Sequence, residues 1–435
     1  MQKTAETKPF AEMSPEELKA VIAAEQKKLD HWSDMDLTLD LTRGKPNQAQ
    51  LDLSSGMLNI ISDRGDCFSA SGLDCRNYGI LDGLPETKKL FSDLLDIPAK
   101  NILVLGNSSL NVMYDTIVRA MLFGVAGGHE PWCRQGRIKF ICPSPGYDRH
   151  FTICREMGIE MVPVKMNDDG PDMNEVYNIA CSDPSVKGMW CVPKFSNPEG
   201  ITYSDEVVEQ IAMMKPAAPD FRIFWDNAYV VHELYDENVP LANIFELAKQ
   251  YGTEDNIFYF ASTSKITFPG SGLAIMAASD KNLEQIRPII ATQTIGYDKI
   301  NQMRHVKFFK NADGIRAHMR LHAAILRPKF ELVENKFEEN LGGLGIAHWT
   351  KPRGGYFISL YVNNGCARRV YQLARSVGVT LTTAGSTYPY GRDPYDANLR
   401  IAPSYPELDE LSQAIEILCS CIKVACAEKI LKDNQ

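Results

Sequence analysis

Two features that would tie the chain to nucleic acid or to a membrane are missing from its 435 residues. The formal net charge is −9 and there is no basic tract, which makes nucleic acid and anionic membrane surfaces poor partners. No apolar run approaches the ~20 residues that span a bilayer. The first residues, MQKTAETKPFAEM, contain no apolar signal core. We therefore expect neither a nucleic-acid partner nor a membrane partner.

The eleven cysteines show no spacing typical of a metal site or a disulfide framework. They are scattered, and no CxxC pair occurs. Reduced, mostly buried thiols in a cytoplasm are the simplest interpretation, and we expect no bound metal. The chain also lacks a G-x-G-x-x-G or Walker A string that opens a helix, which disfavours a nucleotide-binding enzyme.

The middle of the chain has the pattern of an α/β domain. Short apolar runs rich in aromatic and β-branched residues alternate with longer amphipathic stretches, which leave room for crossover helices. The runs are NILVLG (101–106), IKFICPSPGY (138–147), KGMWCVPKFSNP (187–198), FRIFWDNAY (221–229) and NIFYFASTSK (256–265). None alternates strictly, which is typical of strands buried on both faces of a mostly parallel, doubly wound sheet.

The length of the chain predicts two domains. We assign residues 52–312 to a large α/β domain, and residues 1–51 and 313–435 to a smaller α+β domain. Long polar-faced helices and strands in GGYFISLYV and NLRIAPS belong to the smaller one. A helix near the N-terminus is expected to join it, with Ser14 as its cap and Glu17 completing a capping box.

Polar residues follow the ends of the apolar runs, where open α/β sheets bind their ligands. They are Ser108 and Ser109 before a helical pattern, then Tyr147, Asn197, Asp226 with Tyr229, and finally Ser262, Ser264 and Lys265. Taken singly, each also fits an ordinary role as a helix cap, a packed ring, a turn residue or a solvated side chain. Because all of them fall at one predicted edge of the sheet, we interpret them together.

The combination matches the chemistry of pyridoxal phosphate (PLP). Serines at a helix N-terminus offer hydroxyls, N–H groups and the helix dipole to a phosphate. Tyr147 offers a stacking face. The carboxylate of Asp226 can pair with a protonated ring nitrogen, which lets the ring accept electrons. The amine of Lys265 can form an imine with an aldehyde, and this would explain a lysine at the end of a buried strand.

Several strings also resemble the fold type I PLP-dependent aminotransferases. NPEG, DNAY and STSK occur in this order, preceded by YGILDGLPETKKLFSDLL (78–95) and followed by NLRIAP (398–403). LDLTRGKP, CPSPGYDRHF, MNDDGPDM and TSKITFPGSG are more similar to a bacterial aspartate aminotransferase subgroup placed beside MocR-type proteins. The resemblance covers nearly the whole chain. It implies a transaminase, with aspartate and 2-oxoglutarate as the expected substrate pair.

The resemblance gives each residue around the PLP ring a role. Lys265 would bind the cofactor as an imine and shuttle the proton, and Asp226 would pair with the ring nitrogen. Tyr229 and Asn197 would hydrogen-bond the phenolic oxygen of the ring, and Tyr147 would stack on it.

The resemblance also assigns the phosphate site. Ser108, Ser109 and Ser262 would hold the phosphate, and Tyr78 would reach the phosphate of a neighbouring subunit, which implies a homodimer. The family usually places an arginine on the phosphate shortly after the lysine, but KITFPGSGLA has none. Ser264, Ser271 with the 270–272 backbone, or the more distant Lys299 are the candidates to replace it.

The resemblance also assigns the substrate site. Gly44 resembles the family's glycine that lies beside the substrate, and Arg400 resembles the arginine that binds the α-carboxylate of the substrate. A guanidinium can bind a carboxylate through two parallel hydrogen bonds, which suits this role. A dicarboxylic substrate needs a second cation, because an unpaired buried carboxylate is costly. Arg43 and Lys45 flank Gly44, and we expect Arg43 to bind the second carboxylate. The alternative is that both are solvated turn residues. Lys299 is a weaker candidate for the second carboxylate, because its surroundings, IGYDKINQ, are expected to form a loop.

Four other functions share part of this pattern. A β-lyase, a decarboxylase or an aminotransferase with an aromatic or neutral donor would use the same cofactor residues. Arg400 disfavours decarboxylation, in which the carboxylate must leave. A PLP-sensing regulator would carry a winged-helix domain first, whereas only about 40 residues without a basic cluster precede TRGKP.

Overall fold

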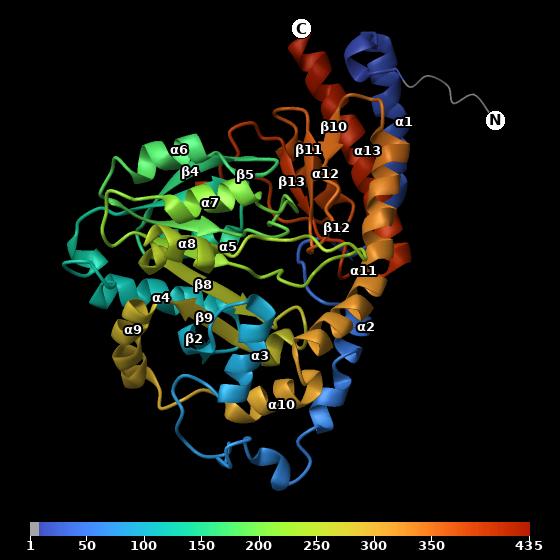
Figure 1. Ribbon diagram of the computed structural model, residues 1–435. Coiled ribbons are helices and arrows are strands. Elements are labelled where there is room, and N and C mark those ends of the chain that lie inside the picture. Colours follow the sequence, from blue (N-terminus) through green and yellow to red (C-terminus); the bar gives the residue numbers. More distant parts are fainter. Residues whose placement is uncertain (1–7) are drawn as a thin grey trace.

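The computed structural model describes residues 8–435 and centres on an eight-stranded sheet (Figure 1). Its strand order is β2-β9-β8-β7-β6-β3-β4-β5. The strands are β2 (Ile102–Leu105), β3 (Lys139–Ser144), β4 (Glu160–Asn167), β5 (Gly170–Pro171), β6 (Val186–Cys191), β7 (Arg222–Asp226), β8 (Ile257–Ser262) and β9 (Ala274–Ala278). The five predicted runs are β2, β3, β6, β7 and β8. Every residue of β2, β6 and β7 is buried, as expected for strands covered on both faces.

The sheet is mostly parallel, with antiparallel strands toward both edges. β4, β3, β6, β7 and β8 are parallel neighbours in that order, so their carboxyl ends share one edge. β9 is antiparallel to both β8 and β2. The segment between β8 and β9 contains no α-helix, so the chain returns antiparallel instead of crossing over. The sequence patterns identified neither β4 nor β9.

Helices cover both faces of this sheet. Ile223 and Trp225 of β7 pack in one core cluster, whereas Phe224 between them packs in another. The first cluster includes residues of α3 (Pro85–Leu95), α6 (Met173–Ala180), α7 (Asp205–Met213) and α8 (Ile244–Tyr251). The second includes residues of α4 (Ser109–Phe123), α5 (Asp148–Glu156) and α9 (Asp280–Gln293). The large sheet is therefore the middle layer of three.

A third core cluster unites the two ends of the chain. It contains residues of α1 (Pro15–Ser33), α11 (Ala312–Leu341), α12 (Ala367–Ser376) and α13 (Leu408–Asp433), and of a sheet in the order β10-β11-β13 (Ala347–Trp349, Ile358–Val362, Asn398–Ile401). β1 (Leu39–Asp40) pairs with β12 (Val379–Thr380), and α1 lies beside α13 (Figure 1). The capping box predicted at Ser14 and Glu17 is present. The exact domain boundaries at residues 52 and 312 stay a prediction.

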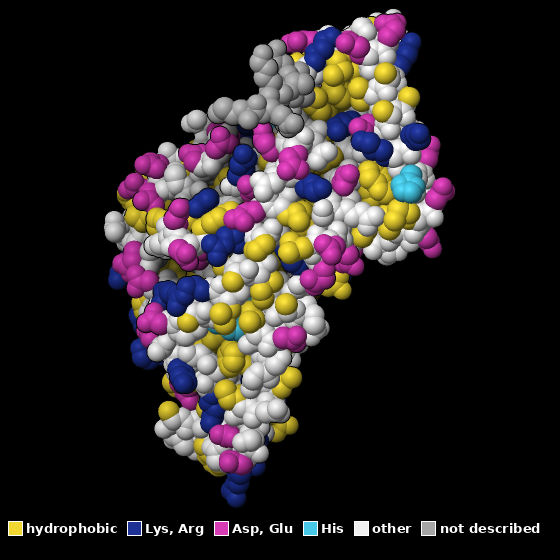
Figure 2. All heavy atoms as spheres, turned by 90° about the vertical axis from the view of Figure 1, so that its right-hand side faces the viewer, with side chains coloured by type: hydrophobic (Ala, Val, Ile, Leu, Met, Phe, Trp, Pro, Cys, Tyr) yellow, Lys and Arg dark blue, Asp and Glu magenta, His cyan; other side chains and the backbone are white. Residues whose placement is uncertain are grey.

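Two short helices complete the chain, α2 (Gln48–Asp52) and α10 (Lys299–Phe309). Within residues 8–435, no helix combines the length and the apolarity needed to cross a bilayer. All eleven cysteines are free and nine of them are buried. On the face in Figure 2, acidic and basic side chains are interspersed, with no expanse of one sign.

Candidate active site

A cavity of about 480 Å³ lies at the carboxyl ends of the parallel strands and reaches the smaller sheet. Ten of the residues singled out in the sequence line it: Arg43, Gly44, Lys45, Ser109, Tyr147, Asn197, Asp226, Tyr229, Lys265 and Arg400. They come from segments more than 350 residues apart in the chain. The strand-end pattern therefore identified a real convergence of side chains.

Lys265 follows β8 and extends its amine toward aromatic rings. Nζ lies 5.2 Å from the ring centroid of Tyr229 and 5.9 Å from that of Tyr356. The side chain is half-buried by surface because it opens onto the cavity, but dense protein packing surrounds the amine. Burial lowers the pKa of Lys265, and the nearby carboxylate of Asp226 opposes this shift only in part. The amine is thus poised toward its neutral, nucleophilic form.

Asp226 is the last residue of β7 and is 2% exposed. Nε2 of His150 lies 3.1 Å from its Oδ2, and because a carboxylate can only accept here, the N–H belongs on Nε2. His150 is held in turn by stacking on Trp190, with ring centroids 4.2 Å apart. The other carboxylate oxygen, Oδ1, is buried and has no hydrogen-bond partner. A buried acceptor without a donor is costly, so this atom fits an N–H supplied by a bound molecule.

Tyr147 and Tyr229 provide the aromatic lining. Tyr147 precedes α5, and its ring meets that of His150 edge-on at 4.9 Å. Burial, together with the charges of Asp226 and Asp148, raises the pKa of Tyr147 to about 12. Burial first, then Tyr147 and Asp226, raises the pKa of Tyr229 well above its ordinary value. Both phenols therefore keep their protons at neutral pH and can donate hydrogen bonds.

Arg400, on β13, is 7% exposed and only partly satisfied. Nη1 donates to Oδ1 of Asp148 at 2.8 Å and to Oδ1 of Asn197 at 3.2 Å. Nη2 donates to Oγ1 of Thr382 at 3.2 Å. Nε is buried and has no partner. The edge formed by Nε and Nη2 can therefore still receive a carboxylate in the bidentate manner that a guanidinium favours.

Gly44 is required by close packing. A Cβ at this position would lie 2.6 Å from the ring of Phe357 and 3.1 Å from Cβ of Tyr356. The segment from Thr42 to Lys45 can line the cavity only because residue 44 has no side chain. Thr382 also fixes this segment, since its hydroxyl donates to the carbonyl of Thr42 at 2.8 Å.

The expected phosphate residues surround the N-terminus of α4. Ser109 lines the cavity, whereas Ser108 caps α4 through the N–H of Asn111. Ser262 donates to Ser264 at 3.0 Å, and Ser264 contacts the carbonyl of Asn107 at 3.5 Å, which brings β8 to this turn. The hydroxyls and the N-terminus of a 15-residue helix suit an anion.

Lys299 and Tyr78, two other residues expected near the phosphate, do not line the cavity. The expected loop around Lys299 is wrong: Asp298 caps a helix there, and Lys299 is its buried first residue. Tyr78 lies on the surface and is 78% exposed, so its expected reach into a neighbouring subunit stays a prediction.

The structure adds residues that the sequence patterns did not single out. Asp148, Arg149 and Thr382 line the cavity, and His150 supports Asp226 from behind it. The signal was available in part, since Asp148, Arg149 and His150 directly follow the run that ends at Tyr147. Arg149 is exposed to the cavity and, among residues 8–435, forms no ion pair within 4 Å. No group of three or more His, Cys, Asp or Glu side chains there could hold a metal ion.

Comparison with known proteins agrees with this arrangement. The sequence model of the aspartate amino-transferase family matches residues 13–434. A putative aminotransferase of Mycolicibacterium smegmatis is 44% identical over 426 residues, which cover 98% of this chain and 100% of the relative. An aspartate aminotransferase of Corynebacterium glutamicum is 44% identical over 403 residues, 93% of each chain.

Solved structures give the same result. The crystal structure of an aspartate transaminase from Corynebacterium glutamicum superposes with a TM-score of 0.94 at 42% identity, over 98% of this chain and 100% of the other. The expected fold and cofactor class are thereby confirmed. The chain belongs to the aspartate aminotransferase family, and it is a PLP-dependent aminotransferase of fold type I.

Proposed function

We propose that the protein transfers the amino group of aspartate to 2-oxoglutarate. The observation that carries this proposal is the distribution of cations in the catalytic cavity. Arg400 keeps one edge of its guanidinium free for an α-carboxylate. Arg43 and Arg149 line the same cavity, and among the described residues neither has an ion-pair partner. If Arg400 binds the α-carboxylate, Arg43 and Arg149 remain to bind a second carboxylate, which suits a dicarboxylic substrate. A substrate with a neutral side chain would leave both arginines without a partner.

The cavity residues fit PLP. The unpartnered Oδ1 of Asp226 would accept from a protonated ring nitrogen, and Lys265 would hold the aldehyde carbon. Ser108, Ser109, Ser262 and Ser264 would surround the phosphate at the N-terminus of α4. When bound, the cofactor supplies an electron sink for the α-carbon of the amino acid.

Asn197 owes its orientation to Arg400. Its Oδ1 accepts from Nη1 of Arg400 at 3.2 Å, so its Nδ2 is turned the other way and is free to donate. The phenol of Tyr229, which keeps its proton because burial raises its pKa, is a second donor. Together, Nδ2 of Asn197 and the hydroxyl of Tyr229 would bind the ring oxygen of the cofactor and orient the ring on Tyr147.

Lys265 would carry the proton that leaves the α-carbon. Since burial lowers its pKa, Nζ can accept a proton at neutral pH more readily than a solvated lysine can. Asp226 and Arg400 act on this pKa in opposite directions, so substrate binding at Arg400 would weaken the repulsion between the two cations. Proton acceptance at Nζ would then be favoured when the site is filled.

We further propose a homodimer and a cytoplasmic location. The exposed phenol of Tyr78 supports a site completed by a partner subunit. Nine buried free thiols are in keeping with a reducing compartment.

The direct test is an assay of the purified protein with aspartate and 2-oxoglutarate. Stoichiometric glutamate and oxaloacetate are expected. A β-lyase would instead release ammonia, and a decarboxylase carbon dioxide, without consuming the 2-oxo acid. Phenylalanine as the better donor would contradict the dicarboxylate specificity but leave the transaminase assignment intact.

A further inference from the structure

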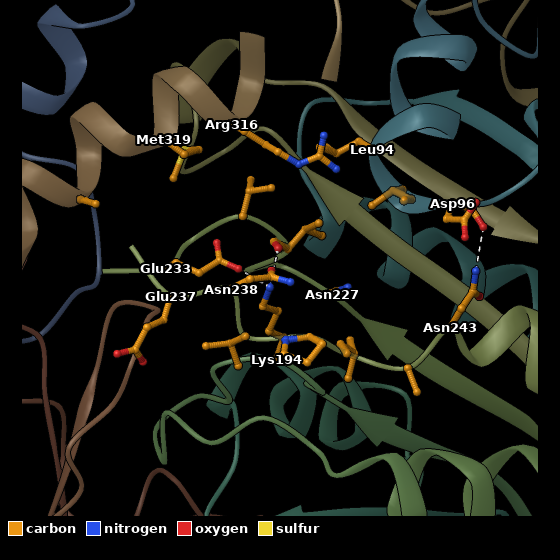
Figure 3. A pocket seen from close by; sticks show the side chains of 18 of the residues that line it. Leu94, Asp96, Lys194, Asn227, Glu233, Glu237, Asn238, Asn243, Arg316 and Met319 are labelled. Carbon is orange, nitrogen blue, oxygen red and sulfur yellow. Dashed lines mark hydrogen bonds and ion pairs between the residues drawn. The ribbon is translucent and has the colours of Figure 1, made fainter. Parts of the chain in front are cut away.

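A second cavity, of about 600 Å³, lies beside the catalytic one and shares no lining residue with it among the described part of the chain. It opens between the strand ends and α11, with Lys194 and Asn227 on the strand side and Arg316 on the helix side (Figure 3). Its volume lies within the roughly 300–1,000 Å³ of ordinary small-molecule sites, far above the ~30 Å³ that one water occupies.

Different residues of the same two chain segments line the two cavities. Asp226 faces the catalytic cavity, and Asn227 lines the second one. Likewise Lys194 lines the second cavity and Asn197 the first. The second cavity is therefore built into the rigid strand ends that form the catalytic site, rather than into a separate surface loop.

Two buried polar atoms at the floor of this cavity have no partner. Nε1 of Trp225 is a donor and Oδ1 of Asn227 is an acceptor, and both side chains are at least 96% buried. They are two residues apart, so they lie on the same face of the strand. Nδ2 of Asn227 donates to the hydroxyl of Tyr259 at 2.7 Å, which fixes Oδ1 as the free end of the amide. A buried donor or acceptor without a partner destabilises the fold unless something binds it.

Two charged groups at the cavity supply further donors near this pair: Lys194, whose charge is balanced by Glu233, keeps one N–H, and Arg320 keeps its positive charge. Nζ of Lys194 is buried and donates to the carbonyl of Val230 at 2.9 Å and to Glu233 at 2.5 Å. An ammonium has three N–H bonds, so one remains. Arg320, at the rim on α11, has no ion-pair partner within the described residues.

The acidic residues nearby do not take up these donors. Glu233 is neutralised by Lys194, and Glu237 pairs with Arg353 at 2.7 Å. Asp96 and Asp236 lie at the exposed mouth, away from the buried floor. The unpartnered buried atoms at the floor are therefore the N–H of Trp225 and the amide carbonyl of Asn227, and Lys194 and Arg320 add further N–H donors.

We propose that the second cavity is a binding site for a small carboxylic acid that also carries an N–H donor, as an amino acid does. The carboxylate takes the free N–H groups of Trp225, Lys194 and Arg320. The N–H of the ligand donates to Oδ1 of Asn227. This site is separate from the catalytic one, and its existence does not depend on which amino acid is the substrate.

Proline is a suitable probe, because its secondary amine cannot be transaminated. Calorimetric titration of the holoenzyme with proline should give a dissociation constant of roughly 1 mM or below. Cyclopentanecarboxylate is the matched ligand, with the same ring and carboxylate but no N–H. It should bind about 10-fold more weakly or worse, because Oδ1 of Asn227 then stays unsatisfied.

Two neighbouring alanines on α11 give a matched pair of variants. Ala323 lines the second cavity, whereas Ala324 is exposed outside it. A323F should fill the cavity and abolish proline binding, and A324F should leave it unchanged. Arg320→Gln, an exposed change that preserves the core, should weaken proline binding about 10-fold. This variant also keeps the test valid if A323F does not fold.

Three outcomes would overturn the proposal. The first is no proline binding up to about 50 mM, which would leave a cavity that holds only water. The second is unchanged binding in both R320Q and A323F. The third is binding that is lost in Arg400→Ala but kept in A323F, since this would mean that proline occupies the catalytic cavity. Binding that survives in Arg400→Ala and disappears in A323F supports the second site, whatever the substrate assay gives.

Discussion

His150 and Asp226 form a buried pair, with Nε2 of the imidazole 3.1 Å from Oδ2 of the carboxylate. Stacking on Trp190 holds the imidazole in place, and Oδ1 of Asp226 has no partner, which leaves it free to accept from the ring nitrogen of the proposed cofactor. His150 thus acts through Asp226, as a positioning residue without contact to the substrate.

The first prediction concerns this pair. His150→Phe keeps the stacking but removes the N–H, and kcat should fall about 10-fold while KM changes little, in line with the loss of one buried hydrogen bond to a charged group. His150→Gln can still donate from its amide and should recover part of the loss. The absorbance spectrum of the bound cofactor should differ between wild type and H150F. Equal losses in both variants with an unchanged spectrum would reduce His150 to a packing role.

The second prediction concerns Asp226 itself. Asp226→Asn retains the shape of the side chain but removes the charge that keeps a ring nitrogen protonated. The variant should still bind PLP, whereas the half-reaction with aspartate should slow by about 100-fold or more, as when a key electrostatic contact is removed. Stopped-flow absorbance measures the half-reaction, and equilibrium dialysis measures cofactor binding. If binding and rate fall in proportion, the carboxylate serves the fold rather than the chemistry.

Part of this site could be predicted from the sequence alone. The strand ends were predictable, because β2, β3, β6, β7 and β8 are short, apolar and buried on both faces. Parallel neighbours share one edge, so the convergence of Tyr147, Asn197, Asp226 and Lys265 followed from topology.

The remaining features depend on contacts across the fold. The pairing of Asp148 with Arg400 joins residues 252 positions apart, and no local pattern encodes it. His150 sits on a helical face, where a buried histidine is indistinguishable by period from ordinary packing. The loop expected around Lys299 is instead the start of a helix, because the side chain of Asp298 caps it.

The third prediction is that Lys265 binds the cofactor covalently. The native protein should show a visible absorbance band that borohydride bleaches, and the cofactor should then stay attached through denaturation. Lys265→Ala should lack the covalent link and the proton carrier. Mass spectrometry of the borohydride-treated protein should find the added mass on the peptide that contains Lys265. Attachment to another lysine would refute the assignment.

The fourth prediction tests the shared site implied by Tyr78. In a mixture of Tyr78→Phe and Lys265→Ala subunits, each hybrid dimer would hold one intact site and one with both defects. Isolated hybrids should therefore show about half the wild-type activity per dimer. Lys265→Ala homodimers should be inactive, and Tyr78→Phe homodimers should show a weakened affinity for the cofactor. A hybrid with only half the activity of the Tyr78→Phe dimer would mean that each site is complete within one subunit.

The fifth prediction separates the two candidate cations for the second carboxylate. Arg43 and Arg149 both line the catalytic cavity but come from distant parts of the chain. Arg43 precedes Gly44, and Arg149 lies at the start of α5. The loss of one charged, hydrogen-bonded contact should lower kcat/KM for aspartate about 10-fold or more. It should leave kcat/KM for alanine or phenylalanine within about twofold, because these substrates have no second carboxylate. Both Arg43→Ala and Arg149→Ala are needed, since both guanidinium groups line the cavity and the larger loss identifies the one that binds.

Arg155→Ala is the matched control for this experiment. Arg155 lies on the same helix as Arg149 but is exposed and pairs with Glu156 at 2.8 Å, outside the cavity. Its removal should change neither substrate class. If Arg43→Ala and Arg149→Ala lower both classes equally, the arginines support the fold and not the specificity. If neither variant lowers kcat/KM for aspartate, the second carboxylate is bound elsewhere. Arg43 and Arg149 would then no longer support a dicarboxylic substrate.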